Sequence, residues 1–137
     1  MVARAQEEAA VIVAVLDASA VLAVYFDEPG AGEVSAALPG ALLSAVNYTE
    51  VIGKCLDHGE VLAVVLRKLS AMGFSVVAHD AHLARRAGAL LPLTKRLGLS
   101  LADRACLALA ERERLPALTA DRSWKSLALD IDIRLIR

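Results

Sequence analysis

The sequence predicts one small α/β domain, in which a parallel β-sheet lies between two layers of helices. Short, almost continuous apolar runs alternate along the chain with segments of helical spacing, and this alternation is typical of a parallel sheet covered on both faces. The 137 residues are 57% hydrophobic but only 4% aromatic, so we expect a core of Ala, Leu and Val. This length fits one domain better than two.

The first strand is expected at residues 11–16, an apolar run rich in β-branched side chains. A helix should follow over residues 18–27, where the apolar positions fall on one side, and Glu28-Pro-Gly should end it. A short helix is expected at residues 32–38, before the break at Pro39-Gly40.

The middle of the chain repeats this order. We expect a strand at residues 41–46, a helix at residues 47–57 and a second helix at residues 60–72. Gly73 should close that helix, and a third strand should cover residues 74–78.

The last part of the chain begins with a helix over residues 81–91, which should stop before Pro92. Residues 92–99 are interpreted as a loop or a broken turn, and residues 101–114 as a strong helix. A strand, a short helix and a final strand complete the expected order: residues 117–120, 122–127 and 131–136.

The ends and the composition of the chain exclude several classes of protein. Residues 1–10 are interpreted as a polar leader and residues 11–137 as the single domain, and no apolar run approaches the ~18 residues of a membrane span. A net charge of −1 gives no overall attraction to nucleic acid. Cys55 and Cys106 have no metal-binding spacing, so they are expected to be buried thiols in a cytoplasmic protein.

Four acidic residues stand at the ends of expected strands or at the starts of expected helices: Asp17, Glu50, Asp103 and Asp121. Each has a structural interpretation taken alone. Asp17 and Asp121 can cap the helices that follow them, and Asp103 lies three residues after Ser100, at capping-box spacing. Glu50 has the same spacing from Asn47 and lies four residues before Lys54, which favours an ion pair.

The four acids together favour a metal site. Strand carboxyl ends and helix N-termini lie at the same edge of a parallel sheet, where ligands bind. Carboxylates gathered there would repel one another unless a cation offset their charge, and carboxylate ligands favour Mg²⁺ or Mn²⁺ over zinc. Such an ion can activate water against a phosphodiester. The chain has no apparent Ser-His-Asp order and no glycine-rich phosphate loop.

Four segments, in this order, resemble the acidic motifs of PIN-domain ribonucleases, and within them most closely the VapC toxins of bacterial toxin–antitoxin pairs. The segments are Val13-Ala-Val-Leu-Asp17-Ala-Ser, Asn47-Tyr-Thr-Glu50-Val, Leu99-Ser-Leu-Ala-Asp103-Arg-Ala-Cys and Thr119-Ala-Asp121-Arg-Ser-Trp. The third is the most specific of the set. The resemblance covers the chain from about residue 11 to its end.

The resemblance implies a fold, an activity and partners. The fold is an α/β/α sandwich with strand order 3-2-1-4-5, and the activity is Mg²⁺- or Mn²⁺-dependent endonucleolytic cleavage of RNA. The partners are a second copy in a homodimer and a small antitoxin that holds the enzyme inactive. The implied catalytic metal ligands are Asp17, Glu50, Asp103 and Asp121, with Asp17 and Asp103 as the primary pair. Ser19 and Thr119 correspond to hydroxyl residues that support such a site, and helix capping is their structural alternative.

Basic residues near the acids suggest a rim for RNA phosphates. Arg104 and Arg122 each follow an acid of the set, and Lys95 and Arg96 precede Asp103. The alternative is an ordinary solvated surface.

The sequence leaves two alternatives to a nuclease. One is a binding module that associates with RNA or protein and cleaves weakly or not at all, although the intact acids speak against it. The other is a phosphotransfer or receiver domain, which needs a second acid beside the one that ends the first strand. The sequence Leu16-Asp17-Ala18 lacks that second acid.

Overall fold

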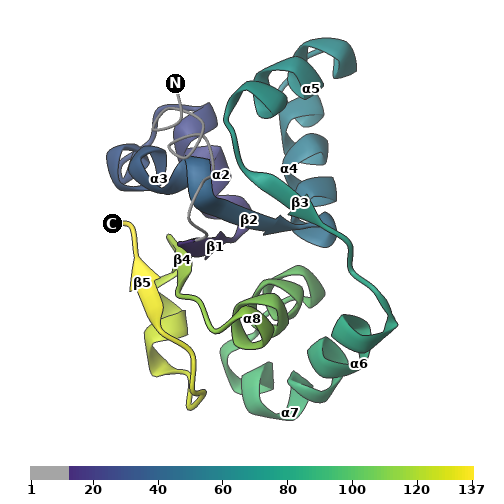
Figure 1. The fold of residues 1–137 in the computed structure, drawn as a ribbon, viewed down its shortest axis with the longest axis vertical. Helices are drawn as coiled ribbons and strands as arrows, with labels where there is room; N and C mark the ends of the chain where they lie inside the picture. Colours follow the sequence, from purple (N-terminus) through teal and green to yellow (C-terminus); the bar gives the residue numbers. More distant parts are fainter. Residues whose placement is uncertain (1–12) are drawn as a thin grey trace, which may run out of the picture.

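The computed structural model describes residues 13–137, which form three layers with the sheet in the middle (Figure 1). All strand pairs are parallel, and the strand order is β3-β2-β1-β4-β5. The strands are β1 (Ala14–Leu16), β2 (Ala41–Ser44), β3 (Ser75–Val77), β4 (Ala117–Thr119) and β5 (Ile133–Leu135). The predicted fold class and strand order are confirmed, while the interpretation of residues 1–10 as a leader lies outside the described residues.

Helices cover both faces of the sheet. The helices are α2 (Ala18–Tyr25), α3 (Ala31–Ala37), α4 (Ala45–Asp57), α5 (Leu62–Ala71), α6 (Ala81–Ala89), α7 (Leu91–Thr94) and α8 (Leu101–Glu113). The described residues also form three 3-10 turns: η1 (Leu38–Gly40) before β2, η2 (Lys95–Leu97) before α8 and η3 (Arg122–Ser126) between β4 and β5. In Figure 1, α2 to α5 lie above the sheet and α6 to α8 lie below it.

The alternation of side chains along the strands divides the apolar interior into two cores. Leu16 and its neighbours on one face pack with α2, α3, α4 and α5, because successive side chains of a strand point to opposite faces. Val15 points the other way and packs with α6, α8 and Trp124. The three central strands are buried throughout, which explains their almost continuous apolar sequences.

Several elements are a few residues shorter or longer than expected, and two of these differences have a clear local cause. The helix predicted to begin at Asn47 begins at Ala45, because the Ser44 side chain accepts a hydrogen bond from the Val46 backbone N–H and caps it. Residues 92–99 are more regular than the expected loop: α7 and η2 occupy most of this stretch. Proline is tolerated in the first turn of a helix, so Pro92 is accommodated as the second residue of α7.

The carboxyl ends of β1, β2 and β4 lead directly into α2, α4 and η3. Functional side chains should therefore be sought along this edge. In the part of the chain that the structure describes, no helix is long and apolar enough to cross a membrane.

Candidate active site

Asp17 is the first residue after β1, and its side chain points into the protein. The residue is only 4% exposed. Its Oδ1 accepts a hydrogen bond from the Ala20 backbone N–H at 2.9 Å, so Asp17 caps α2 as the sequence predicted. A helix cap seldom needs to be buried, and Ser or Asn would serve equally well. The burial of a carboxylate here therefore calls for a further explanation.

Two hydroxyl groups hold the Asp17 carboxylate in place. Ser19 Oγ donates to Asp17 Oδ1 at 2.7 Å, and Thr119 Oγ1 donates to Asp17 Oδ2 at 2.5 Å. Each hydroxyl also accepts a hydrogen bond from the backbone beyond β4: Ser19 from Ala120 N–H and Thr119 from Asp121 N–H. The two hydroxyls thus join the end of β1 to the end of β4 around one carboxylate.

Burial raises the pKa of the Asp17 carboxyl to about 6, because desolvation disfavours the charged form. The hydrogen bonds from Thr119, Ser19 and Ala20 lower this pKa in part, and the nearby negative charge of Asp103 raises it. At neutral pH the carboxylate is therefore ionised at a cost to the folded protein.

Asp103 supplies the second carboxylate from the first turn of α8. It forms a capping box with Ser100: Asp103 N–H donates to Ser100 Oγ, and Ser100 N–H donates to Asp103 Oδ2. One turn later on the same helix face, Cys106 is fully buried. Burial raises the pKa of the Cys106 thiol, and the charges of Asp17 and Asp103 raise it further. The two carboxylates thus lie near a thiol that stays protonated.

The other two acids have local partners. Glu50 lies 3.9 Å from Lys54 Nζ on α4, and Asp121 is exposed and caps η3 by accepting from Ser123 N–H and Oγ. Among residues 13–137, no three His, Cys, Asp or Glu side chains lie close enough together to hold a metal ion. Glu50 and Asp121 thus have partners on their own elements, and a joint role of the four acids as metal ligands stays a prediction. The expected Asn47–Glu50 capping box is wrong, since Ser44 is the cap.

The predicted basic rim is only partly formed. Lys95, Arg96 and Arg122 are exposed, as contact with phosphate requires. Arg104 is half-buried, and its Nη1 donates to the backbone carbonyl of Ala87 on α6 at 3.0 Å. Arg104 therefore joins α8 to α6, and the exposed cations of the rim are Lys95, Arg96 and Arg122.

Sequence reasoning did not single out Asn47 as a site residue. Its side chain is 1% exposed, and its Nδ2 donates to the backbone carbonyl of Ala102, the residue before Asp103. The position of Asn47 among the apolar residues of the helix could have indicated that its side chain is buried. Asn47, Val51 and Cys55 follow one another at intervals of four residues and line the buried stripe of α4. A polar residue on such a stripe needs a partner.

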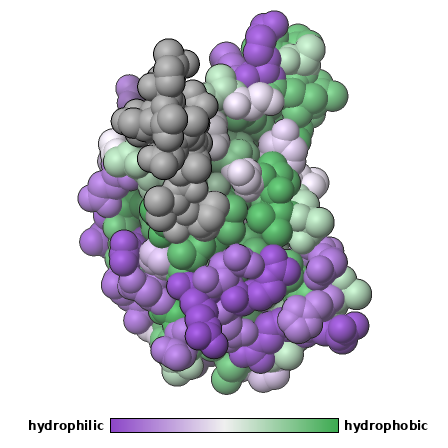
Figure 2. Space-filling model, in the orientation of Figure 1, coloured by the Kyte–Doolittle hydropathy of each residue, from purple (hydrophilic) through white to green (hydrophobic). Residues whose placement is uncertain are grey.

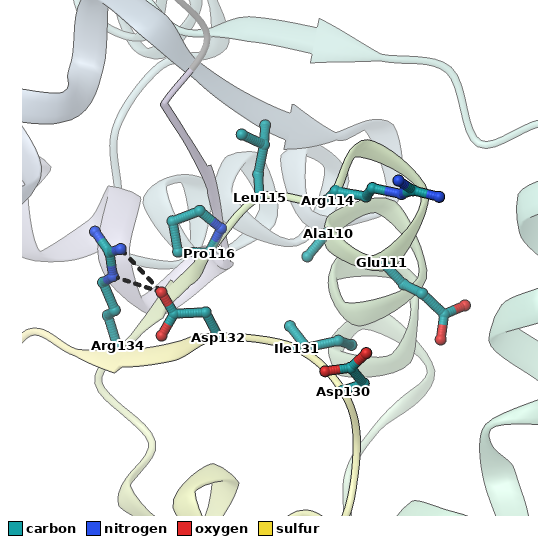
Figure 3. A pocket seen from close by; sticks show the side chains of 9 residues that line it. All are labelled: Ala110, Glu111, Arg114, Leu115, Pro116, Asp130, Ile131, Asp132 and Arg134. Atoms are coloured by element: carbon teal, nitrogen blue, oxygen red, sulfur yellow. Dashed lines mark hydrogen bonds and ion pairs between the residues drawn. The ribbon is translucent and has the colours of Figure 1, made fainter.

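A large pocket lies elsewhere, at the C-terminal end of α8 and the start of β4 and β5. It measures about 800 Å³ and includes Arg114, Pro116, Asp130, Asp132 and Arg134. Figure 3 shows its carboxylates spread around the pocket instead of converging, and Asp132 forms an ion pair with Arg134. The size of this pocket therefore does not mark it as the catalytic site.

The residues at the sheet edge fit a magnesium-type ion. Mg²⁺ is usually held by one or two carboxylates and keeps several water molecules, so it needs no cluster of three protein ligands. Asp17 and Asp103 provide two hard oxygen ligands, and a cation would relieve the unfavourable charge of the buried Asp17. Zinc sites usually contain Cys or His ligands, and the thiol nearby is Cys106, whose raised pKa keeps it protonated.

Solved structures with this fold were found among toxin–antitoxin proteins. A toxin–antitoxin complex from Klebsiella pneumoniae superposes with a TM-score of 0.70 at 20% identity, covering 90% of this chain and 98% of that chain. DNA-bound VapBC from Salmonella typhimurium gives 0.70 at 15% identity, covering 92% and 99%. VapC20 from Mycobacterium tuberculosis, a sarcin–ricin loop cleaving toxin, gives 0.66 at 15% identity, covering 82% and 93%.

Sequence comparison addresses the family directly. No curated protein sequence matches the chain. The PIN domain family, however, matches residues 14–129, which include the four acids and all the strands except β5. The order of the acidic motifs, the 3-2-1-4-5 sheet and this match agree with one another. The chain therefore belongs to the PIN domain family.

Proposed function

We propose that the protein is a divalent-metal-dependent endoribonuclease and the toxin of a toxin–antitoxin pair. The observation that carries this proposal is Asp17: a buried carboxylate, held by two hydroxyl donors and close to the charge of Asp103. The buried negative charge lowers the free energy of unfolding of the metal-free chain, and a bound cation would offset this loss. Membership of the PIN domain family and the likeness to VapC structures support the same activity.

In this proposal Asp17 and Asp103 hold Mg²⁺ or Mn²⁺, and Glu50 and Asp121 act through water. A bound ion of this kind activates water and stabilises negative charge on a phosphodiester. Ser19 and Thr119 orient the Asp17 carboxylate and favour its ionised form, because hydrogen bonds to a carboxylate lower its pKa. Asp103 lies in the first turn of the 13-residue helix α8, where the helix dipole favours negative charge.

RNA is the proposed substrate, bound beside these acids by exposed cations. Lys95 and Arg96 on η2 precede α8, and Arg122 directly follows Asp121. The net charge of −1 provides no general attraction to nucleic acid. Affinity for RNA therefore depends on these local cations and on the metal ion, and we expect it to fall steeply with salt.

A small antitoxin is the proposed regulatory partner, as in the complexes from Klebsiella and Salmonella. A groove of about 390 Å³ begins beside Ser19, which contacts Asp17, and its lining combines the apolar Leu22 and Phe26 with Glu28, Lys54, His58 and Arg137. Exposed apolar side chains on α4 and at the start of α5 are available nearby, including Leu56, Val61 and Leu62, and Figure 2 shows apolar surface over this part of the molecule. A peptide bound along the groove, with both apolar and charged side chains, would cover Ser19. A homodimer, as expected from the resemblance, is part of the same proposal.

RNA cleavage by the purified chain tests this function. With Mg²⁺ or Mn²⁺ the wild type should cut RNA, EDTA should stop the reaction, and Asp17→Asn and Asp103→Asn should each lower the rate by at least 100-fold. Asp130→Asn is the matched control, because Asp130 is exposed at the opposite end of the molecule. Cleavage at the wild-type rate by Asp17→Asn would exclude the proposed mechanism. RNA binding without cleavage by the wild type would favour the binding-module alternative.

A further inference from the structure

The amide of Asn47 joins the two helices that carry Glu50 and Asp103. Asn47 lies in the first turn of α4, one turn before Glu50, and its Nδ2 donates to Ala102 O in the first turn of α8 at 3.1 Å. The two residues are 55 positions apart in the sequence. The Asn47 side chain thus links the first turn of α4, which precedes Glu50, to the first turn of α8, which carries Asp103.

The orientation of this amide is fixed by its partner. A carbonyl oxygen can only accept a hydrogen bond, so Nδ2, and not Oδ1, must face Ala102. As a result Oδ1 is buried without a hydrogen-bond donor among the described residues. Such an unsatisfied acceptor opposes folding, and an apolar residue on the inner stripe of α4 would avoid the loss.

The Ala102 carbonyl does not depend on Asn47 for stability. Ala102 is the second residue of α8, so its carbonyl can also accept the hydrogen bond from the backbone four residues later. Replacing the amide by an apolar group of similar size should therefore leave no new unpaired group on α8. An apolar residue at position 47 would therefore suit folding at least as well as Asn47 does. The presence of a polar side chain there favours a role in function.

We propose that Asn47 is a positioning residue that acts through Asp103: its amide fixes the first turn of α8 relative to Glu50 and so places the Asp103 carboxylate for metal binding. This inference rests on the proposed metal-dependent function. Residues that orient metal ligands typically affect metal affinity by 10- to 100-fold when they are replaced.

The test compares the metal affinity and the stability of the same variant. Asn47→Leu should weaken Mn²⁺ binding, measured by isothermal titration calorimetry, by roughly 10- to 100-fold. In EDTA its Tm should be equal to or above that of the wild type. Asn47→Ala, which adds no bulk, should show the same loss of Mn²⁺ affinity if Asn47→Leu fails to fold. Thr94→Val is the control, because Thr94 is fully buried and donates to Leu90 O. Its Mn²⁺ affinity should be unchanged.

The possible results separate the positioning role of Asn47 from the proposed function. If the wild type binds Mn²⁺ and both Asn47 variants bind it within about twofold of the wild type, the positioning role is wrong while the proposed function stands. The same holds if the Tm of Asn47→Leu falls in EDTA without loss of Mn²⁺ affinity, because Asn47 is then a packing residue. If the wild type neither binds Mn²⁺ nor cleaves RNA, the proposed function itself is wrong, and the inference fails with it.

Discussion

Asp17 performs two tasks with one side chain. As a cap it satisfies the Ala20 N–H at the start of α2, and as a buried carboxylate it is held by the hydroxyls of Ser19 and Thr119. The first task accounts for its position after β1, but not for its burial. Its pKa of about 6, against an ordinary value of 3.8, corresponds to a cost of about 3 kcal/mol in the free energy of folding at pH 8.

The sign of this effect gives a prediction for the metal-free protein. Because the folded-state pKa of Asp17 is raised, its contribution to stability is complete below about pH 3.8 and is lost as the pH rises through about 6. In EDTA, Asp17→Asn should therefore increase the free energy of unfolding by about 1–3 kcal/mol at pH 8 and by much less at pH 4. Urea denaturation at the two pH values measures this difference.

Asp130→Asn serves as the control for that experiment, since Asp130 is exposed. It should change stability by less than about 0.5 kcal/mol at either pH. A loss of stability in Asp17→Asn at pH 8 would mean that the ionised carboxylate is required for folding, and it would remove the main support for a metal at this position.

Single residues of the site were predictable to different degrees. Asp17, Asp103, Ser19 and Thr119 were predicted because each stands at a strand end or a helix start, and the structure joins Ser19 and Thr119 to Asp17. The resemblance set Asp17 and Asp103 apart as the primary pair. The local partners of Glu50 and Asp121, which are Lys54 and Ser123, depend on side-chain direction, which the sequence pattern defines poorly. Arg104 follows an acid in sequence, yet its long side chain reaches another helix.

At the scale of elements, the strands and long helices followed from apolar runs and helical spacing, while their ends depended on local capping. Ser44 begins α4 two residues earlier than Asn47 would have done. The stretch from Leu91 to Leu97 is helical although Pro92 suggested a break. Such boundaries are set by hydrogen bonds and backbone angles that a residue pattern defines poorly.

The junction between the start of α3 and the end of the chain gives a prediction about the fold. Gly30 has φ of +95°, and a Cβ atom there would lie 2.4 Å from Ile136 O. Gly30→Ala should therefore lower the free energy of unfolding by at least about 2 kcal/mol, through both the left-handed backbone and the steric overlap. Thermal or urea denaturation measures this loss.

Gly32 provides the matched comparison two residues away. It lies within α3, and nothing is within 4 Å of a Cβ atom placed there. Gly32→Ala should stabilise the protein by about 0.5–1 kcal/mol, because alanine loses less backbone entropy in a helix. Equal effects of the two substitutions would contradict the close packing of Gly30 against Ile136.

At the scale of the whole molecule, the parallel sheet explains why distant residues meet. β1 lies between β2 and β4, so Asp17 and Thr119 come together although 102 positions separate them. The sequence predicted this common edge from the alternation of strands and helices, and the resemblance to PIN-domain ribonucleases implied the strand order. The sequence could not indicate that a pocket of about 800 Å³ would form at the opposite end, because that pocket depends on how side chains fill the space between α8 and β5.

The proposed metal site at this common edge does not require a preformed cluster of ligands. The negative charge of Asp103 raises the pKa of both Asp17 and Cys106, and the described residues include no group of three ligands. A Mg²⁺ ion that keeps most of its water is compatible with two carboxylates. Metal binding should also weaken below about pH 6, because protons then compete for Asp17.

The most direct test of this account is an anomalous difference map from crystals of the wild-type protein soaked in Mn²⁺ at about pH 8. The account predicts a peak in contact with the carboxylates of both Asp17 and Asp103, with no such peak in Asp17→Asn crystals. A peak at another place on the molecule, or none at all in a protein that still cleaves RNA, would contradict the assignment of Asp17 and Asp103 as the metal ligands.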